Sequence, residues 1–498
     1  MKGDHNHEKV RYPVYSLCAL PRAHRLRTAS EAEDPPPGDT SSDTSTTAEE
    51  TTNYLSQFSD IDYKGATYTI GTTSDTQYPN YVGDNLNGES VNDAQFQRDA
   101  WIESNYNVSI EYIKYDDAGK LTQAIKSQVM ADDDTLDCAE NGMATNLAPL
   151  SSQGMLANLK AIDGLNLEAS WWSQSMNKEF TINNKLYTTT GPIAFSYYYS
   201  PRIIAYNLRL ADEYGLDNLY EVVENGKWTI DYMYDSMKSV THDLNGDGEM
   251  GEDDMWGASV DEYSAAGFYI SAGGTQTAIS SDGTPSFLFN DPNNYSRIEK
   301  IASIIGNAEV TQKAEQLASR SGSYNIVDKV YTFKNGHALY LGYGAQAIAF
   351  YLRDMEDDYG ILPVPKYDES QQNYITFGNA YVPAYIALPA NNNRGSMNGV
   401  ILDSMGFISQ RDVQPLVASV TLKGKAARDE GSHKMIDIIY EDIYLDLNSC
   451  YDLGGSFTLL RDITMGKAEN FSSKWESKKT KATSDFEKLL EQFLAIEE

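Results

Sequence analysis

Oxygen-bearing side chains recur at alternate positions in one short stretch, DLNGDGEMGEDD, which runs from Asp243 to Asp254. A Ca²⁺ ion takes about six to eight oxygen ligands, and a tight loop can supply them when a glycine permits the turn. The spacing predicts a calcium site formed by Asp243, Asn245, Asp247, Glu249 and Asp254. Glu249 would offer its backbone carbonyl, and Asp254 stands where a bidentate glutamate is more usual. The alternative is an acidic, glycine-rich surface loop that binds no ion.

The segments on either side of this loop favour a structural role for such an ion. TIDYMYDSMKSV before it has the spacing of a helix, whereas MWGASV after it reads as a short strand. A calcium sensor needs a pair of helices that can open. We therefore expect a structural calcium brace, and the main function must lie elsewhere in the chain.

Motifs that would indicate an enzyme are missing from the sequence. It contains no HExxH, GxSxG, GxxxxGK[ST] or strand-following GxGxxG pattern, and its six histidines are scattered. Pairs of carboxylates are abundant because the chain has 72 acidic residues, so they indicate solvated faces and no particular hydrolase. The sequence therefore predicts a protein that is not an enzyme and has no catalytic residue.

Length and charge narrow the class of protein. A chain of 498 residues exceeds what one hydrophobic core usually serves, so two lobes are expected. With 39 basic and 72 acidic residues the net charge is −33, which disfavours nucleic acid and anionic lipid as partners. Cys18, Cys138 and Cys450 are too far apart to form a disulfide framework; a Cys138–Cys450 bridge and two buried free thiols both stay open.

The amino-terminal region differs in composition from the rest. Residues 1–27 carry basic residues and a short apolar run without a proper lipoprotein signal, and we interpret them as an aberrant signal sequence. Residues 28–60 are rich in Ser, Thr, Pro and acids, which predicts a disordered tether. The expected location is the extracellular face of the cell membrane, with the protein lipid-anchored or secreted.

Alternating and helical patterns predict α/β structure in both lobes. YKGATYTIGTT, ESVNDAQFQRDAWIESNYN and NVSIEYIKY read as strand, helix and strand, followed by the helix AGKLTQAIKSQVMADDD and the strand end TLDCAEN. KLYTTTG and SPRIIAYN also read as strands. The tail beyond Met397 reads as helices, including SHKMIDIIYEDIY and TSDFEKLLEQFLAIEE.

Four stretches, taken in order, resemble the extracellular solute-binding proteins of ABC transporters, family 1, the carbohydrate-binding group. They are ASWWSQSMNKEFTINNKLYTTTG, SYYYSPRIIAYNLRLADEYGLDNLYEVVENGKWTID, FKNGHALYLGYG with DDYGILPVPKYD, and FGNAYVPAYIALPANN. The resemblance spans roughly Tyr63 to the carboxyl terminus; the lipoprotein signal of the family is missing.

The resemblance implies a type II periplasmic-binding-protein-like α/β fold with two lobes, a hinge of several crossings and a ligand cleft between the lobes. Lobe 1 would comprise residues 61–190 and 376–425, and lobe 2 residues 191–375 and 426–498. The chain would cross near Leu186–Pro192, return near Tyr374–Gly378 and cross again in the helical tail. The function implied is extracellular capture of a sugar or oligosaccharide by lobe closure and its delivery to the permease of an ABC importer.

The resemblance also places candidate ligand-binding residues. Tyr343 in GYG would project into the solvent-open cleft, Asp261 and Tyr263 in DEY would face it, and Asn141 would lie at a strand end of the first lobe. Ser74 and Asp75 would follow the first strand. Flat aromatic rings and short polar side chains suit sugar faces and hydroxyls, and the chain has 35 tyrosines against 15 phenylalanines. Trp171 and Trp172 are expected to pack on a lobe surface, and Trp256 behind the calcium-like loop.

The partners expected are a sugar, the permease subunits and, through an anchor only, the membrane; the protein itself is expected to be a monomer without a transport cofactor. A peptide or other non-sugar ligand is the alternative within this class. A secreted glycoside hydrolase and a passive surface adhesin are the alternatives from other classes.

Overall fold

The computed structural model describes residues 54–73, 83, 85–280, 284–417, 430–441 and 443–496. The chain divides into two units, Met1–Tyr54 and Leu55–Glu498, and the elements below belong to the second unit apart from Tyr54. The predicted signal region, most of the predicted tether, and Ser74 and Asp75 lie outside the described residues.

The predicted tether extends too far along the chain. Tyr54–Phe58 form a 3-10 turn in which Leu55 and Phe58 are buried. The Phe58 ring packs edge-on against Tyr106, with 6.4 Å between the ring centroids. Apolar side chains with packing partners gain from order, so this turn is part of the fold and the prediction of disorder up to residue 60 is wrong.

The first sheet has four strands in the order β12-β3-β1-β2. Strands β1, β2 and β3 are parallel, and β12 runs antiparallel to β3. Helix α3 begins at the side-chain cap of Asp117 and turns Leu121 and Ile125 onto the sheet. Gln128 on this helix bonds both the N–H and the carbonyl of Leu136, which fixes the turn into β3. The bounds are β1 Ala66–Thr73, α2 Ser90–Tyr106, β2 Val108–Tyr115, α3 Ala118–Ala131, β3 Cys138–Gly142, α4 Ala148–Ser152, α5 Gln174–Phe180 and β12 Ala384–Ala387.

The second sheet has five strands in the order β10-β4-β9-β5-β8. Strands β8, β5 and β9 are parallel, whereas β4 runs antiparallel to β9 and to β10. Helix α8 is capped by Thr229 and buries Met233 and Met237 in the core beside β5. The bounds are β4 Arg202–Asn207, α6 Leu208–Glu213, α7 Leu219–Glu224, α8 Ile230–Val240, β5 Trp256–Val260, α9 Glu262–Ser271, β6 Thr277–Ile279, β7 Pro285–Phe287, α10 Pro292–Ile304, β8 Thr311–Lys313, α11 Ala314–Leu317, α12 Tyr331–Lys334, β9 Ala338–Gly344 and β10 Tyr359–Leu362.

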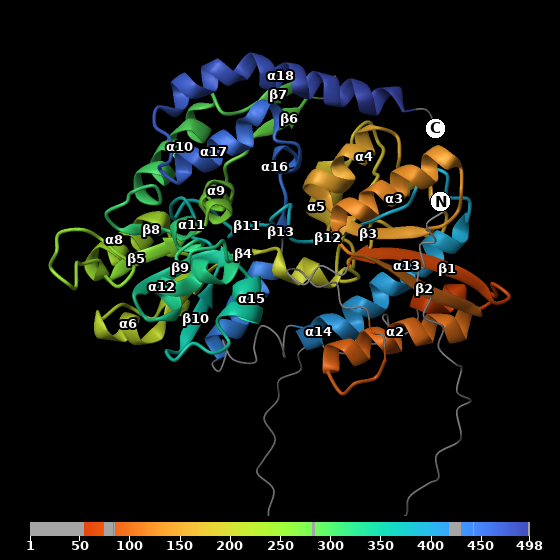
Figure 1. The fold of residues 1–498 in the computed structure, drawn as a ribbon, viewed down its shortest axis with the longest axis horizontal. Coiled ribbons are helices and arrows are strands. Elements are labelled where there is room, and N and C mark those ends of the chain that lie inside the picture. The colour runs from red at the N-terminus through yellow and green to blue at the C-terminus, as the bar shows by residue number, and fades with distance from the viewer. Residues whose placement is uncertain are drawn as a thin grey trace, which may run out of the picture. The chain divides into compact units, whose positions relative to one another are not determined.

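Both sheets share one topological plan (Figure 1). Each has three parallel strands in the order second, first, third, and an antiparallel strand beside the third. The antiparallel strand β4 joins its sheet after the chain has left the first sheet, and β12 joins the first sheet after the chain has left the second. Each antiparallel strand is thus the first strand after the chain passes from one sheet to the other.

The crossing segments contain little regular structure. KLYTTTG, predicted as a strand, forms only isolated bridges, from Lys185 to Ile182 and from Thr189 to Ile386. Strands β11 (Thr376–Phe377) and β13 (Ile443–Tyr444) are two residues long and pair in parallel. The helix predicted for SHKMIDIIYEDIY ends at Glu441, because the last two residues of this stretch form the short strand β13.

The remaining helices follow β12. Helix α13 packs against α2, α15 against β10, and α17 against α9 and α10. Helix α18 contacts β7, α17 and α4, and buries an apolar face that includes Trp475, Phe486 and Phe493. Of the described helices, none has both the length and the apolar character to span a bilayer. The bounds are α13 Ser396–Ile408, α14 Gln414–Leu416, α15 Glu430–Glu441, α16 Leu447–Tyr451, α17 Ser456–Thr464 and α18 Phe471–Ala495.

Candidate ligand-binding site

A cavity of about 460 Å³ is lined by residues that meet one edge of each sheet. Parallel strands present the loops after their carboxyl ends at one edge, where ligands bind in open α/β sheets. The lining includes the turns after β3, β5 and β9, and the segments that enter the antiparallel strands β4 and β12. The lining residues are Gly142, Met143, Ala144, Thr145, Asn146, Arg202, Asp261, Glu262, Tyr263, Tyr324, Ile326, Lys329, Tyr343, Gln346, Asn379, Ala380 and Tyr381.

Asp261 lies at the point where β5 gives way to α9. Its carboxylate caps the helix by accepting the N–H of Ser264 at 2.8 Å. Arg202, at the start of β4, donates Nη1 to both Asp261 oxygens at 3.3 and 3.2 Å. Both side chains are buried. The charges of this ion pair cancel, so it adds polar groups but no net charge to the cavity wall.

Tyrosine rings form much of the rest of the wall. Tyr263 on α9 lies 5.3 Å from the ring of Tyr381, which comes from the segment before β12. The Arg202 guanidinium lies 5.6 Å from the Tyr263 ring centroid. Tyr324 and Tyr381 keep 67% and 38% of their surface exposed. Two rings therefore remain available to a ligand at solvent-accessible positions.

Tyr343 lines the cavity as predicted, but it does not project freely into solvent. Only 2% of its surface is exposed, and its ring meets Tyr351 edge-on at 6.2 Å between centroids. A Cβ on Gly342 would approach Val260 to 3.2 Å, so the strand is closely packed beside Tyr343. The expectation that this ring projects into a solvent-open cleft is wrong, because β9 is a central strand with side chains packed on both of its faces.

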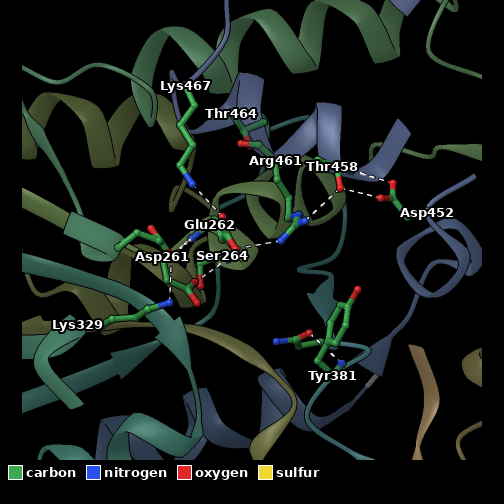
Figure 2. Close-up of polar contacts among 12 residues, drawn as sticks. Asp261, Glu262, Ser264, Lys329, Tyr381, Asp452, Thr458, Arg461, Thr464 and Lys467 are labelled. Atoms are coloured by element: carbon green, nitrogen blue, oxygen red, sulfur yellow. Dashed lines mark hydrogen bonds and ion pairs between the residues drawn. The ribbon is translucent and has the colours of Figure 1, made fainter. Parts of the chain in front are cut away.

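Glu262 joins the cavity to the carboxyl-terminal helices. Arg461 Nη1 donates to Glu262 Oε1 at 3.0 Å, and Lys467 Nζ to Oε2 at 2.9 Å (Figure 2). Burial raises the pKa of this carboxyl, but the hydrogen bond from Lys467 and the charge of Arg461 outweigh it and bring the pKa below its usual value. Glu262 is therefore ionised and committed to two cations at neutral pH.

The remaining cation in the lining is Lys329. Its Nζ lies 3.2 Å from Glu315 Oε1, which also accepts the N–H of Glu262 at 2.9 Å. Each charged lining residue thus has an oppositely charged partner within the structure. A ligand without net charge suits such a wall.

Asn141 does not line the cavity. Its amide donates to the carbonyl of Ala118 at 3.1 Å and to Thr122 Oγ1 at 3.0 Å, so it holds α3 against β3. The adjacent residues, Gly142 to Asn146, line the cavity in its place. Asn141 lies at the predicted strand end, but it is the residues after it that line the cavity.

The predicted calcium loop is held by its own backbone. Asp243 accepts the N–H groups of Gly246 and Gly248 at 2.6 and 2.8 Å, and Asp254 accepts those of Leu244 and Gly251 at 2.9 and 2.6 Å. Within the described residues, no three acidic, histidine or cysteine side chains gather as a metal-binding group. Calcium binding at this loop stays a prediction.

Trp256 packs behind the predicted calcium loop as expected, whereas Trp171 and Trp172, expected on a lobe surface, are buried. The indoles of Trp171 and Trp172 are buried and both donate to Asp403 Oδ1, at 3.0 and 3.3 Å. Trp256 donates its indole N–H to Gly251 of the predicted calcium loop at 2.7 Å. The two cysteines in the described residues, Cys138 and Cys450, are buried free thiols, which decides against a bridge between them.

No family model matches the chain, and no curated protein matches it. Solved structures do match. An ABC substrate-binding protein from Listeria monocytogenes in complex with cycloalternan is 14% identical, with a TM-score of 0.53 over 85% of this chain and 99% of that one. A sugar transporter from Rhizobium etli in an open conformation is 15% identical, with a TM-score of 0.54 over 86% of this chain and 100% of that one.

A cyclic alpha-maltosyl-1,6-maltose binding protein from Arthrobacter globiformis is 14% identical, with a TM-score of 0.52 over 87% of this chain and 99% of that one. This chain has the fold of ABC substrate-binding proteins. The two-lobed α/β architecture expected from the sequence is confirmed. In an open α/β fold of this kind, ligands bind at the carboxyl ends of the strands, where this cavity lies.

Proposed function

We propose that this protein captures a sugar or oligosaccharide at the extracellular face of the membrane and delivers it to the permease of an ABC importer. The observation that carries the proposal is the cavity of about 460 Å³ lined by four tyrosines and by charged residues already paired within the protein. Tyrosine rings suit the apolar faces of sugar rings, and polar side chains suit hydroxyls. The cavity volume falls in the range of about 300–1,000 Å³ typical of small-molecule sites.

The fold and the named ligands of similar structures support this proposal. The Listeria and Arthrobacter proteins are described as complexed with cycloalternan and as binding a cyclic maltosyl-maltose. The chain's acidic surface suits an extracellular protein that meets an uncharged solute. Ligand capture would proceed by closure of the two lobes about the crossing segments.

The two carboxylates in the lining argue against the hydrolase alternative. Glycoside hydrolysis needs a protonated carboxylic acid and a second carboxylate on opposite sides of one bond. Asp261 and Glu262 are sequence neighbours, and both are bound to cations. Neither is arranged as a proton donor.

Calorimetric titration with neutral mono- and oligosaccharides tests the proposal, with tripeptides as the competing ligands. We expect saturable binding of at least one saccharide and a smaller radius of gyration in X-ray scattering when it binds. Binding of peptides alone would replace the proposal by peptide transport. Release of reducing ends from a polysaccharide would replace it by hydrolysis.

A further inference from the structure

Arg461 lies behind the cavity wall and contacts two residues that form it. It does not line the cavity itself. Its Nη1 donates to Glu262, and its guanidinium carbon lies 4.7 Å from the centroid of the Tyr263 ring. One side chain on α17 therefore holds two successive residues at the start of α9.

The other end of the guanidinium is also fixed. Arg461 Nη2 donates to Thr458 Oγ1 at 3.2 Å, and Thr458 Oγ1 in turn donates to Asp452 at 2.6 Å (Figure 2). Asp452 accepts the backbone N–H of Thr458 as well, at 3.0 Å. Hydrogen bonds at both Nη atoms restrict the rotation of the guanidinium, which favours its position over the tyrosine ring.

Tyr263 depends on such support because it stands at the first turn of α9 with part of its surface exposed. Its described ring contacts are with Arg461, Arg202 and Tyr381. A cation over the face of a tyrosine ring attracts it and fixes its tilt. Arg461 is the supporting contact that comes from the carboxyl-terminal helices.

We propose that Arg461 is a positioning residue, which sets ligand affinity by holding Tyr263 and Glu262 in the binding arrangement without touching the ligand. This inference rests on the proposed function, since it assumes that the cavity binds a ligand. It extends the site to Asp452 and Thr458, which are not among the residues that line the cavity described above.

A double-mutant cycle separates positioning from general stability. The probe is the saccharide bound most tightly in the panel above, measured by calorimetry on the full chain. Arg461→Met should weaken binding about five- to tenfold in the wild-type background but less than about twofold in a Tyr263→Leu background. Arg461→Lys should recover part of the affinity, because an ammonium can still reach Glu262 but cannot span both partners.

Arg411→Met is the matched control. Arg411 also pairs with a carboxylate, Asp412, and lies 5.5 Å from a ring centroid, that of Phe407, but it is not part of the cavity wall. The Arg411→Met variant should bind the saccharide with an affinity within about twofold of wild type. If Arg461→Met fails to fold, Thr458→Val tests the same support from the far side and should weaken binding about two- to fourfold.

Equal losses from Arg461→Met in both backgrounds, or no loss in the wild-type background, would overturn the inference. A wild-type protein that binds only a tripeptide would refute sugar capture, and the same cycle run with that tripeptide would still test Arg461. A protein that binds neither saccharides nor tripeptides would refute both.

Discussion

At the scale of residues, Tyr343 combines a cavity position with a core position. Its ring is buried among the residues that cover one face of the second sheet. Tyr343→Ala should therefore lower the free energy of unfolding by about 3–5 kcal/mol, as for other large aromatic deletions in cores. Tyr343→Phe keeps the ring and should retain most of the stability. Urea unfolding measures both; a loss below about 1 kcal/mol in the alanine variant would mean that the ring is not packed.

Tyr324 offers the opposite case, a ring that lines the cavity with most of its surface exposed. We expect Tyr324→Ala to leave unfolding unchanged and to weaken an oligosaccharide about five- to tenfold, because one stacking surface is lost. The same variant should bind a monosaccharide that fits among the buried residues with less than about a twofold loss of affinity. Calorimetry with one sugar series of increasing length decides this, and equal losses at every length would contradict an outer stacking position.

Sequence reasoning found some of these residues and missed others for a physical reason. The resemblance places Tyr343, Asp261 and Tyr263, which lie at or just after the carboxyl ends of the parallel strands β9 and β5. Arg202 is the first residue of its strand, and it meets the same edge only because β4 runs antiparallel. Arg461 and Glu262 lie 199 residues apart. No local sequence pattern predicts such a pair.

At the scale of elements, the loop from Asp243 to Asp254 tests the calcium prediction. If it binds Ca²⁺ with the affinity usual for extracellular modules, about 10⁻⁴ to 10⁻³ M, then millimolar calcium should raise the melting temperature and EDTA should reverse the rise. Saccharide affinity should stay the same, because the loop contributes no residue to the cavity. Asp247→Asn, a substitution at an exposed site, should remove the calcium response; a melting temperature indifferent to calcium would leave the loop as an ion-free turn.

Strand β3 carries a buried acid that should make stability depend on pH. Glu140 accepts a hydrogen bond from Thr72 at 3.3 Å, and its burial raises its pKa to about 7. The folded protein keeps this proton up to about pH 7, while the unfolded chain releases it near 4.5. The contribution of Glu140 to stability therefore falls as pH rises between these values and is constant above them.

Glu140→Gln removes that titration. It should raise the free energy of unfolding at pH 7.5, by an amount on the order of 2–3 kcal/mol, and change it little at pH 4.5. The exposed Glu111 on β2 supplies the control Glu111→Gln, with no pH-dependent gain expected. Denaturant unfolding at the two pH values measures the effect, and a gain equal at both would show that burial does not hold the proton.

Long periodic elements were predictable and short ones were not. Helices α2, α3 and α8 and strands β1 and β2 carry enough spacing to be recognised alone. Strands β11 and β13 exist because they pair with each other, although Phe377 and Tyr444 are far apart in sequence. KLYTTTG alternates like a strand but has only single bridges to pair with.

At the scale of the whole molecule, the first sheet is not encoded by one continuous segment, because β12 follows all five strands of the second sheet. The fragment Tyr63–Lys185 contains β1, β2 and β3 but lacks β12, and it lacks α13, which packs on α2. It also loses Asp403, the shared acceptor of Trp171 and Trp172. We expect the fragment to melt without a cooperative transition in calorimetry, because its sheet keeps an unpaired edge. A cooperative melt would show that the three strands suffice.

Because β12 lies late in the sequence, β3 lacks one of its strand partners during much of the synthesis of the chain. Ala384–Ala387 pairs with residues 139–142, so the partner of β3 emerges only when roughly three-quarters of the polypeptide has been synthesised. At about 5–20 residues per second, β3 waits on the order of ten to fifty seconds with an open edge. During that interval the open edge of β3 can pair with other nascent chains or bind a chaperone. The yield of folded protein should therefore depend on how fast the stretch between Gly142 and Ala384 is translated.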